Sequence, residues 1–337
     1  MVNYLQLSKT NIAKKYRIKF PNFPTAKLAR LMYAENVLTF KDVESCRYVL
    51  RYIEGKAGKV KRDQLKNKDL VMKKSRSLNP YNLPESYEEK REPFILPTSC
   101  NNILLISDLH IPYHNIEAVT IALDYGKKEN VNTIFINGDL IDNHQISKFE
   151  SDPKKRSVKQ EFDATREFLV QLRKAFPKAL IYWLKGNHCI RWEKFLYSKV
   201  REIWNDDYFF LEERLQLNSV GVKILDDKVL VKAGKLSITH GHHIFKGAFT
   251  PVNPSRGAFL KAKQSLIVGH LHRPSHHPET DLDGKIISCW STGCLCELRA
   301  DYSPLVGNTM HGFAHLQIAN DGDYTVKNYS IIKGKLC

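Results

Sequence analysis

Aspartate, asparagine and histidine residues recur in five short clusters between residues 108 and 272. The clusters are DLH at 108–110, GDLID at 138–142, GNH at 186–188, THGH at 239–242 and GHLH at 269–272. Carboxylate oxygens, amide oxygens and imidazole nitrogens are ligands that suit borderline divalent metals in hydrolytic sites. A lone histidine is more often structural, but five such clusters in succession predict a metal site.

Each cluster follows a segment typical of a β-strand. The five segments are NILLIS (102–107), NTIFIN (132–137), ALIYWL (179–184), KLSIT (235–239) and SLIV (265–268). Helices are expected over 116–128, 158–176 and 190–203, and further strands over 285–290, 313–318 and 324–332. This order predicts an α/β fold with sheets layered between helices. Because such sheets bind ligands at the carboxyl ends of their strands, we expect the five clusters to converge there.

The clusters, in this order, resemble the motifs DxH, GDxxD, GNH, HG and GHxH of the calcineurin-like metallophosphoesterases. The resemblance covers residues 100–275, and the longer run at 138–153 is similar to a phage and bacterial branch that often carries a small N-terminal module. It implies a four-layer α/β/β/α sandwich that hydrolyses phosphoesters through in-line attack of an activated water on phosphorus. It also implies two divalent metals, with manganese expected first and iron, zinc, nickel or magnesium as alternatives.

The resemblance assigns a role to each matching residue. One metal would be held by Asp108, His110 and His272, the other by Asn187, His240 and His270, with Asp139 bridging both. A shared carboxylate offsets the mutual repulsion of two cations. His188 matches the catalytic histidine that protonates the leaving oxygen, although a structural role or metal ligation is the alternative.

One position departs from the family pattern. Many relatives have an acid directly after GNH, whereas this chain has Cys189. If that acid orients the histidine, another must replace it here for proton donation to stay efficient. Glu193 and Asp142 are the two candidates.

Four residues close to the motifs are expected to contact substrate: Arg191, Asn143, His144 and His114. For Arg191 the alternative is a helix-surface position. Serine/threonine protein phosphatases of this superfamily have an arginine directly after GDxVD, where this chain has Asn143, and this disfavours that class. We expect His242 and His243 beside the second metal, His276 and His277 in a solvated loop, and Cys294 and Cys296 as buried thiols.

The net charge of +16 is unevenly distributed. Residues 1–91 hold 21 Lys and Arg against 9 Asp and Glu, whereas the remainder holds 31 against 27. A basic module of this kind often binds polyanions, although it can also serve solubility alone. We therefore expect three regions: a basic module over 1–60, a basic linker over 61–97 and the metallophosphoesterase domain over 98–337.

Two short helices are expected in the basic module. The first would be capped by Thr25 and end at Asn36, and the second would begin near Asp42 and end at Gly55. Lys41, Arg47 and Arg51 lie off the apolar stripe of the second helix. This arrangement suits a helix-turn-helix that binds DNA or RNA through these three cations. A structural or protein-docking module is the alternative.

The sequence thus favours a phosphodiesterase or nuclease that acts on DNA or RNA. The alternatives are a small-molecule phosphatase, a cyclic-nucleotide phosphodiesterase, or a nucleic-acid-binding protein with a vestigial metal site. The sequence has no apolar run of 18 residues and no signal-peptide pattern, and its seven cysteines are scattered. We therefore expect a cytoplasmic protein without a membrane partner. The branch resemblance extends this to a phage-encoded enzyme in the host cytoplasm. Oligomeric state has no sequence signal.

Overall fold

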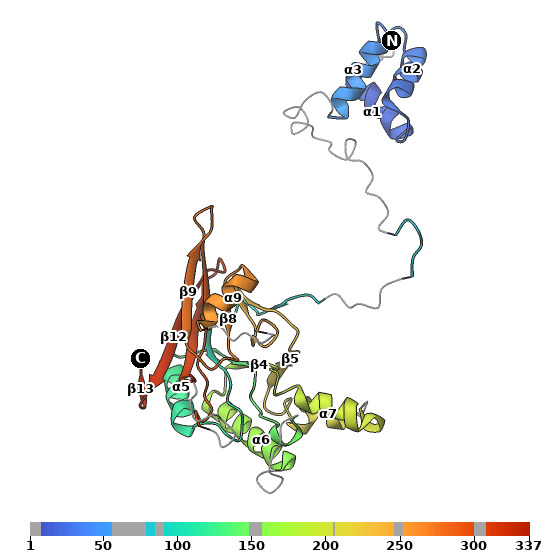
Figure 1. Cartoon of the computed structure of the whole chain (residues 1–337). Helices are drawn as coiled ribbons and strands as arrows, with labels where there is room; N and C mark the ends of the chain where they lie inside the picture. The colour runs from blue at the N-terminus through green and yellow to red at the C-terminus, as the bar shows by residue number, and fades with distance from the viewer. Residues whose placement is uncertain are drawn as a thin grey trace. The chain divides into compact units, whose positions relative to one another are not determined.

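The computed structural model describes residues 8–55, 79–84, 91–147, 157–204, 206–245, 252–299 and 308–337. The chain forms two compact units, Met1–Glu88 and Glu89–Cys337, which we call the N-terminal unit and the C-terminal unit (Figure 1). Most of the predicted linker over 61–97 and the end of the 138–153 run lie outside the described residues.

The described residues of the N-terminal unit form three helices, α1 (Lys9–Lys19), α2 (Thr25–Glu35) and α3 (Val43–Ile53). Their apolar faces meet in a small core that includes Leu28, Met32 and Leu50. The expected start of α3 is confirmed, because the Asp42 carboxylate accepts the backbone N–H of Ser45 at 2.7 Å.

Two expectations for this unit need correction. Thr25 does not cap α2: Pro24 holds the cap position, and the Thr25 hydroxyl, now inside the helix, donates to the Glu54 carboxylate at 2.9 Å. The helix-turn-helix is not confirmed, because residues 36–42 join α2 to α3 and a helix-turn-helix uses a turn of about three or four residues. The helix α1 was not anticipated.

The C-terminal unit contains two β-sheets. The seven-stranded sheet has the order β13-β12-β11-β2-β3-β4-β5. Its strands are β2 (Asn102–Ile106), β3 (Thr133–Asn137), β4 (Leu180–Leu184), β5 (Val222–Leu225), β11 (His311–Ile318), β12 (Tyr324–Ile332) and β13 (Lys335–Leu336). The six-stranded sheet has the order β1-β6-β7-β8-β10-β9. Its strands are β1 (Phe94–Ile95), β6 (Val231–Ala233), β7 (Leu236–Ile238), β8 (Leu266–Val268), β9 (Ser275–Thr280) and β10 (Ile286–Ser291).

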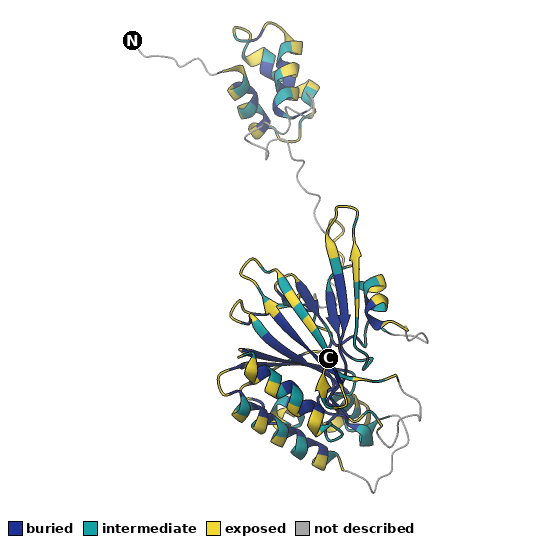
Figure 2. Ribbon diagram, turned by 90° about the vertical axis from the view of Figure 1, so that its left-hand side faces the viewer, coloured by how far each residue is buried: buried dark blue, intermediate teal, exposed yellow. Residues whose placement is uncertain are grey.

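Side chains that alternate along the strands separate the layers. In β2, Leu104 and Ile106 belong to the core between the seven-stranded sheet and its helices, whereas Ile103 and Leu105 belong to the core between the sheets. This is the two-residue period of a strand that is covered on both faces. The resulting central strands are buried, as Figure 2 shows.

Helices cover the outer faces of both sheets. Against the seven-stranded sheet lie α5 (Ile116–Lys128), α6 (Val158–Ala175), α7 (Arg191–Lys199) and α8 (Leu211–Arg214), and α9 (Pro254–Ala262) covers the six-stranded sheet. Short 3-10 turns are η2 (His144–Ile146), η3 (Arg201–Ile203) and η4 (Asp207–Phe209). The predicted four-layer α/β/β/α sandwich is confirmed. Within the described residues, no helix has the length and apolarity that crossing a bilayer requires.

Some local predictions differ from the structure. The helix predicted over 190–203 divides into α7 and η3, because Val200 leaves the helical conformation with φ of −139°. His276 and His277 lie on strand β9 rather than in a loop, and the His276 ring stacks on Trp290 with centroids 5.0 Å apart. The regular pairing of β9 with β10 explains why these histidines adopt an extended conformation.

Candidate metal centre

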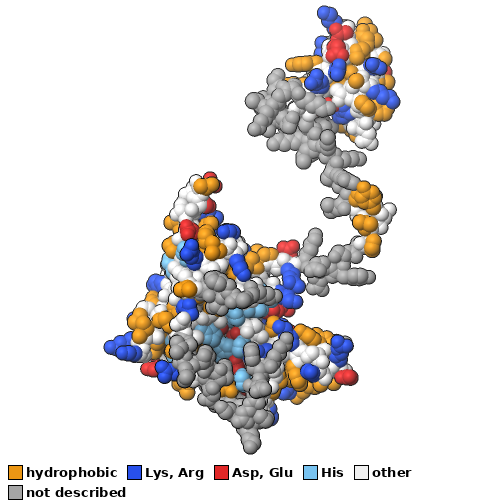
Figure 3. Space-filling view, in the orientation of Figure 1, with side chains coloured by type: hydrophobic (Ala, Val, Ile, Leu, Met, Phe, Trp, Pro, Cys, Tyr) orange, Lys and Arg blue, Asp and Glu red, His pale blue; other side chains and the backbone are white. Residues whose placement is uncertain are grey.

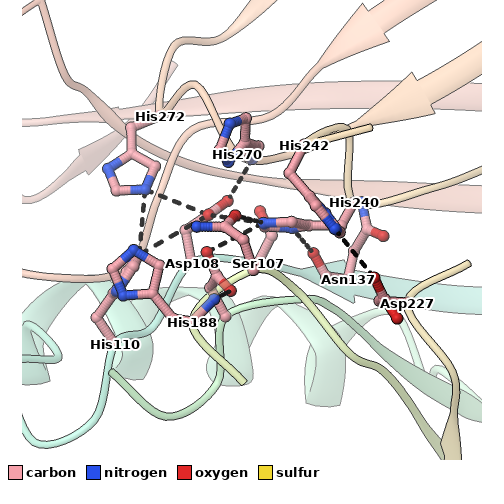
Figure 4. Close-up of polar contacts among 12 residues, drawn as sticks. Ser107, Asp108, His110, Asn137, His188, Asp227, His240, His242, His270 and His272 are labelled. Carbon is pink, nitrogen blue, oxygen red and sulfur yellow. Dashed lines mark hydrogen bonds and ion pairs between the residues drawn. The ribbon is translucent and has the colours of Figure 1, made fainter. Parts of the chain in front are cut away.

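The polar clusters meet where the carboxyl ends of two sets of parallel strands face each other. Strands β2, β3 and β4 are parallel neighbours in one sheet, and β7 and β8 are parallel neighbours in the other. The residues that follow these strands are Asp108 and His110, Asp139, Asn187 and His188, His240, and His270 and His272. Figure 4 shows the labelled members of this set approaching one another from both sheets. In Figure 3 histidines gather in a hollow of the C-terminal unit.

Unusual backbone conformations turn these side chains inward. Five of the residues adopt a left-handed conformation with φ between 43° and 69°: Asp108, His110, Asp139, His270 and His272. Such a conformation costs a residue other than glycine about 1–3 kcal/mol and persists only where the surroundings fix it. Here neighbouring loops fix it, since the His110 N–H donates to the Asp139 carbonyl at 2.9 Å and the His270 N–H donates to the Asp108 carboxylate at 3.0 Å.

Two glycines allow these loops to approach closely. A Cβ atom on Gly138, which has φ of +89°, would collide with the imidazole of His240. A Cβ atom on Gly186 would collide with the carboxylate of Asp139. The glycines of GDLID and GNH are therefore required by the packing of the metal-ligand candidates themselves.

The first predicted ligand set converges. His272 Nε2 lies 3.2 Å from Asp108 Oδ1 and 3.2 Å from His110 Nε2. Asp108 Oδ1 is buried and makes no hydrogen bond within the described part of the chain. An oxygen without a hydrogen bond that faces two imidazole nitrogens suits a divalent cation, which would satisfy all three lone pairs.

The second predicted set converges beside the first. His240 Nε2 lies 3.0 Å from Asp139 Oδ2 and 3.2 Å from Asn187 Oδ1. Asp139 has ligand atoms within 4.8 Å of those of Asp108 and His110 and, separately, of those of His240 and His270. Its carboxylate therefore lies between the two sets, where the resemblance places a bridging ligand.

A backbone contact orients the His240 ring. His240 Nδ1 lies 2.8 Å from the Asn137 carbonyl, so Nδ1 donates to this carbonyl and Nε2 is directed at the site, where a bound metal would displace its proton, as in many metal-binding histidines. Burial alone would lower the pKa of His240, but the negative charge of Asp139 outweighs it and raises this pKa to about 9. The same attraction holds the pKa of Asp139 well below its usual range despite complete burial. The site thus strongly favours positive charge.

Asp142, the last residue of GDLID, is the acid that contacts His188. Its Oδ1 atom lies 2.7 Å from His188 Nδ1 and 2.8 Å from His110 Nδ1. Burial opposes ionisation of Asp142, but the hydrogen bonds from the two histidines hold its pKa far below the ordinary value. Glu193 instead pairs with Lys185 at 2.6 Å. Of the two acids that the sequence offered, Asp142 therefore contacts His188.

The residues expected to contact substrate lie in three different places. Arg191 is beside His188, with Nη2 3.1 Å from His188 Nε2 and Nη1 donating to the Asp142 carbonyl at 2.9 Å. Asn143 is buried and donates to the His188 carbonyl at 3.1 Å, and His144 lies 3.9 Å from the Asp142 carboxylate. His114 faces away from this group, with its ring 6.1 Å from that of Phe168 on α6.

Two nearby residues, Asp227 and Glu161, were not anticipated from the sequence, and Cys296, expected only as a buried thiol, also approaches the centre. Cys296 Sγ lies 3.9 Å from His272 Nδ1, and Asp227 contacts both His242 and His243, at 3.2 and 2.8 Å. Glu161 on α6 is fully buried. No motif contains these residues, and their loops or helix reach the centre only through the tertiary fold. The predicted burial of Cys294 and Cys296 is confirmed.

One family model matches this chain, and several solved structures are similar to it. Residues 102–302 match the sequence model of the family described as calcineurin-like phosphoesterase. A search of curated proteins finds no match. Among solved structures, a Vps29 mutant from Entamoeba histolytica is 18% identical, with 70% of this chain and 96% of that chain covered and a TM-score of 0.37. The phosphoesterase Yfce from E. coli is 17% identical, with 67% and 98% covered and a TM-score of 0.33. A dimetal phosphatase from Danio rerio is 13% identical, with 68% and 96% covered and a TM-score of 0.33.

The fold and the convergent ligands define a metal-dependent hydrolase of phosphoesters. The match covers more than half of the chain, and the protein belongs to the calcineurin-like phosphoesterase family.

Proposed function

We propose that this protein is a phosphodiesterase that cleaves DNA or RNA and recruits it through the N-terminal unit. The observation that supports recruitment is the exposed position of Lys41, Arg47 and Arg51 on or beside α3. Only Arg47 among them has an ion pair within the described residues, a 3.2 Å contact to the exposed Glu44. Solvated cations of this kind bind phosphates and release counterions, which supplies affinity that does not depend on sequence.

In the C-terminal unit we propose a site for two divalent cations, with manganese as the first candidate. Asp108, His110 and His272 would hold one ion, Asn187, His240 and His270 the other, and Asp139 both. When bound, the ions would activate the attacking water and stabilise charge on the phosphoryl oxygens. Mixed oxygen and nitrogen donors suit manganese, iron or zinc.

Three residues of the chain would act on the substrate side of these ligands. His188 would donate a proton to the leaving oxygen, and Asp142 would hold its ring through the 2.7 Å contact to Nδ1. Arg191 lies at His188 Nε2, where its guanidinium would contact a nonbridging phosphate oxygen. A substrate phosphate at the metal centre would therefore contact both His188 and Arg191.

A turnover screen tests the reaction class. The purified protein with manganese is assayed on a phosphomonoester, bis-p-nitrophenyl phosphate, cyclic nucleotides, and DNA and RNA oligonucleotides. Cleavage of the oligonucleotides and of the small diester is expected. Turnover of monoesters or cyclic nucleotides without oligonucleotide cleavage would instead identify a small-molecule phosphatase or a cyclic-nucleotide phosphodiesterase.

A charge variant of the full chain tests recruitment. Replacement of Lys41, Arg47 and Arg51 by Gln should lower kcat/KM for oligonucleotides and reduce the slope of log kcat/KM against log salt by about 2–3, because each phosphate contact contributes about 0.7–0.9. Activity on the small diester should not change. The matched control exchanges the same residues as K41R, R47K and R51K, which keeps the charge and should retain the slope. An unchanged slope in the Gln variant would exclude recruitment by α3.

A further inference from the structure

A groove leads away from the metal centre along one face of helix α7. It has a volume of about 600 Å³, and Asn187, a predicted metal ligand, lies in its wall. Five residues of α7 line one side of it, Arg191, Lys194, Phe195, Ser198 and Lys199, and Ile146 and Ser147 also line it. We call this feature the α7 groove. It connects a cationic surface directly to the position where a phosphoester would react.

The sequence of α7 explains why its cations face the groove. Residues 191, 194, 195 and 198 recur at helical spacing and therefore share one face. Trp192 and Leu196 lie on the other face and are buried in the core, where the Trp192 indole N–H donates to the Phe209 carbonyl at 2.6 Å. Packing of the apolar face against the core holds α7 in place, and the opposite face therefore lines the groove.

The charge of the groove is not offset from within the helix. Glu193 is the only acid of α7, and it pairs with Lys185 at 2.6 Å instead of with a groove residue. Lys194 and Lys199 are exposed, and Figure 3 shows Lys and Arg side chains over α7. Phe195 is half-buried and its ring packs on Trp192 with centroids 6.2 Å apart. The groove thus combines cations with a partly accessible aromatic ring.

We propose that the α7 groove binds a single-stranded segment of nucleic acid next to the scissile phosphodiester. Lys194 and Lys199 would contact phosphates, and Phe195 would stack on a base. This inference rests on the proposed nuclease function. Cations that track a backbone together with an aromatic platform characterise single-strand binding, because a base inside a duplex cannot stack on a side chain.

The length of the groove is consistent with this occupant. From Arg191 to Lys199 the helix rises about 12 Å. Stacked nucleotides advance about 3.4 Å each along a strand, so the α7 face can accompany about three nucleotides. Arg191 at one end lies beside His188, so the bound strand would continue directly into the metal centre.

The first test removes the two lysine charges in the full-length, manganese-loaded protein. For K194Q/K199Q, the slope of log kcat/KM against log salt on a single-stranded oligonucleotide should fall by about 1.4, since each phosphate contact to a single strand contributes about 0.7. Hydrolysis of bis-p-nitrophenyl phosphate should remain unchanged. The matched control is K333Q/K335Q, which removes two charges near β13, at the opposite edge of the sheet from β5. The control should keep the wild-type slope.

The second test addresses stacking. Phe195→Ala should lower kcat/KM on the oligonucleotide about 5–10-fold, which is the low end of what base stacking contributes, and Phe195→Tyr should restore it. On an oligonucleotide with abasic sites, wild type and Phe195→Ala should be equal. The small-diester assay reports whether Phe195→Ala still folds.

The outcomes separate the two proposals. If wild type cleaves oligonucleotides but K194Q/K199Q keeps the slope of the control, the α7 groove is not the binding site and the nuclease function stands. If Phe195→Ala loses as much on the abasic oligonucleotide as on the intact one, stacking is excluded. If wild type hydrolyses the small diester but no oligonucleotide, both proposals fail.

Discussion

The N-terminal and C-terminal units present their polar residues in opposite ways. In the C-terminal unit Asp108, Asp139 and His240 are buried. Each has its side chain held by a hydrogen bond with a backbone group at the end of another strand. In the N-terminal unit Lys41, Arg47 and Arg51 are exposed on or beside a regular, well-capped helix. The metal centre of the C-terminal unit thus depends on side chains whose orientation is fixed by many neighbours, whereas the N-terminal unit presents positive charge at its surface.

This difference predicts two kinds of response to substitution. Substitution of a buried charged residue should cause a large loss of activity or stability, because its partners are left as unpaired buried charges. An exposed cation gives small effects that add up and that salt screens. Substitutions of the buried metal-ligand candidates in the C-terminal unit should therefore change turnover on every substrate, and those on α3 should change only polymer affinity and its salt dependence.

The largest effect is expected from Asp139→Asn. Asp139 belongs to both ligand sets, and an amide cannot supply the negative charge that two adjacent cations require. We expect kcat on bis-p-nitrophenyl phosphate to fall about a thousandfold or more, which corresponds to about 4 kcal/mol of lost transition-state stabilisation. Elemental analysis should also show that the variant retains less metal than the wild type. Full activity and full metal content in this variant would contradict the metal centre.

A smaller effect is expected from Asp142→Asn, which removes no metal-ligand candidate but weakens the contacts to His188 and to the ligand candidate His110. Loss of such an outer partner typically costs about 10–100-fold in activity or metal affinity. The loss in kcat should be greater for diesters with poor leaving groups, since these need the proton most. Glu193→Gln is the control, because Glu193 contacts Lys185 rather than the histidine. Equal losses in the two variants would show that Asp142 does not orient His188.

The sequence predicted that the ligand candidates converge, because a local rule governs their placement. Asp108, Asp139 and His240 each follow a recognisable apolar strand, and parallel strands bring their carboxyl ends together. The rule does not extend to partners that arrive from elsewhere. The sequence could not decide which of Asp142 and Glu193 contacts His188, because this depends on the direction in which helix α7 points the Glu193 side chain. In the structure Glu193 points toward Lys185, which directly follows strand β4.

The missed elements share a weak local signal. Helix α1 has the sequence KTNIAKKYRIK, whose few apolar residues give little periodicity, and it forms because Ile12 and Ala13 pack on the other two helices. Strand β9 is largely exposed and contains a proline, so its residues alternate poorly, and its pairing with β10 determines its structure. Helix α9 is short and contains Gly257, which weakens a helix interior, although Pro254 at its first position is compatible with a helix start. Tertiary contacts override local propensity in all three cases.

The smallest effect, on stability rather than turnover, is expected from Glu161→Gln. Both Glu161 carboxylate oxygens are buried, and the backbone N–H groups of Asn143 and His144 only partly offset the cost of this burial. Burial, aided by the nearby charge of Asp142, raises the pKa of Glu161 from 4.5 to about 8. The folded protein therefore keeps this proton at pH values where the unfolded chain has released it, and stability falls as the pH rises from about 4.5 to 8. Gln resembles the protonated carboxyl at every pH.

The Glu161→Gln variant should consequently gain stability over wild type at pH 8.5 but much less at pH 5.5. A gain in Tm on the order of 5 °C at the higher pH is expected, since about 1 kcal/mol shifts Tm by about 2–4 °C in a domain of this size. All four tryptophans lie in the C-terminal unit, at positions 183, 192, 204 and 290, so tryptophan fluorescence follows its unfolding separately from that of the N-terminal unit. Both proteins are measured with saturating manganese, because bound metal itself raises Tm. A Tm difference that is the same at both pH values would mean that Glu161 is already ionised in the folded protein. Glu161 would then behave like an exposed charge, and the contrast between the buried polar residues of the C-terminal unit and the exposed cations of the N-terminal unit would not extend to α6.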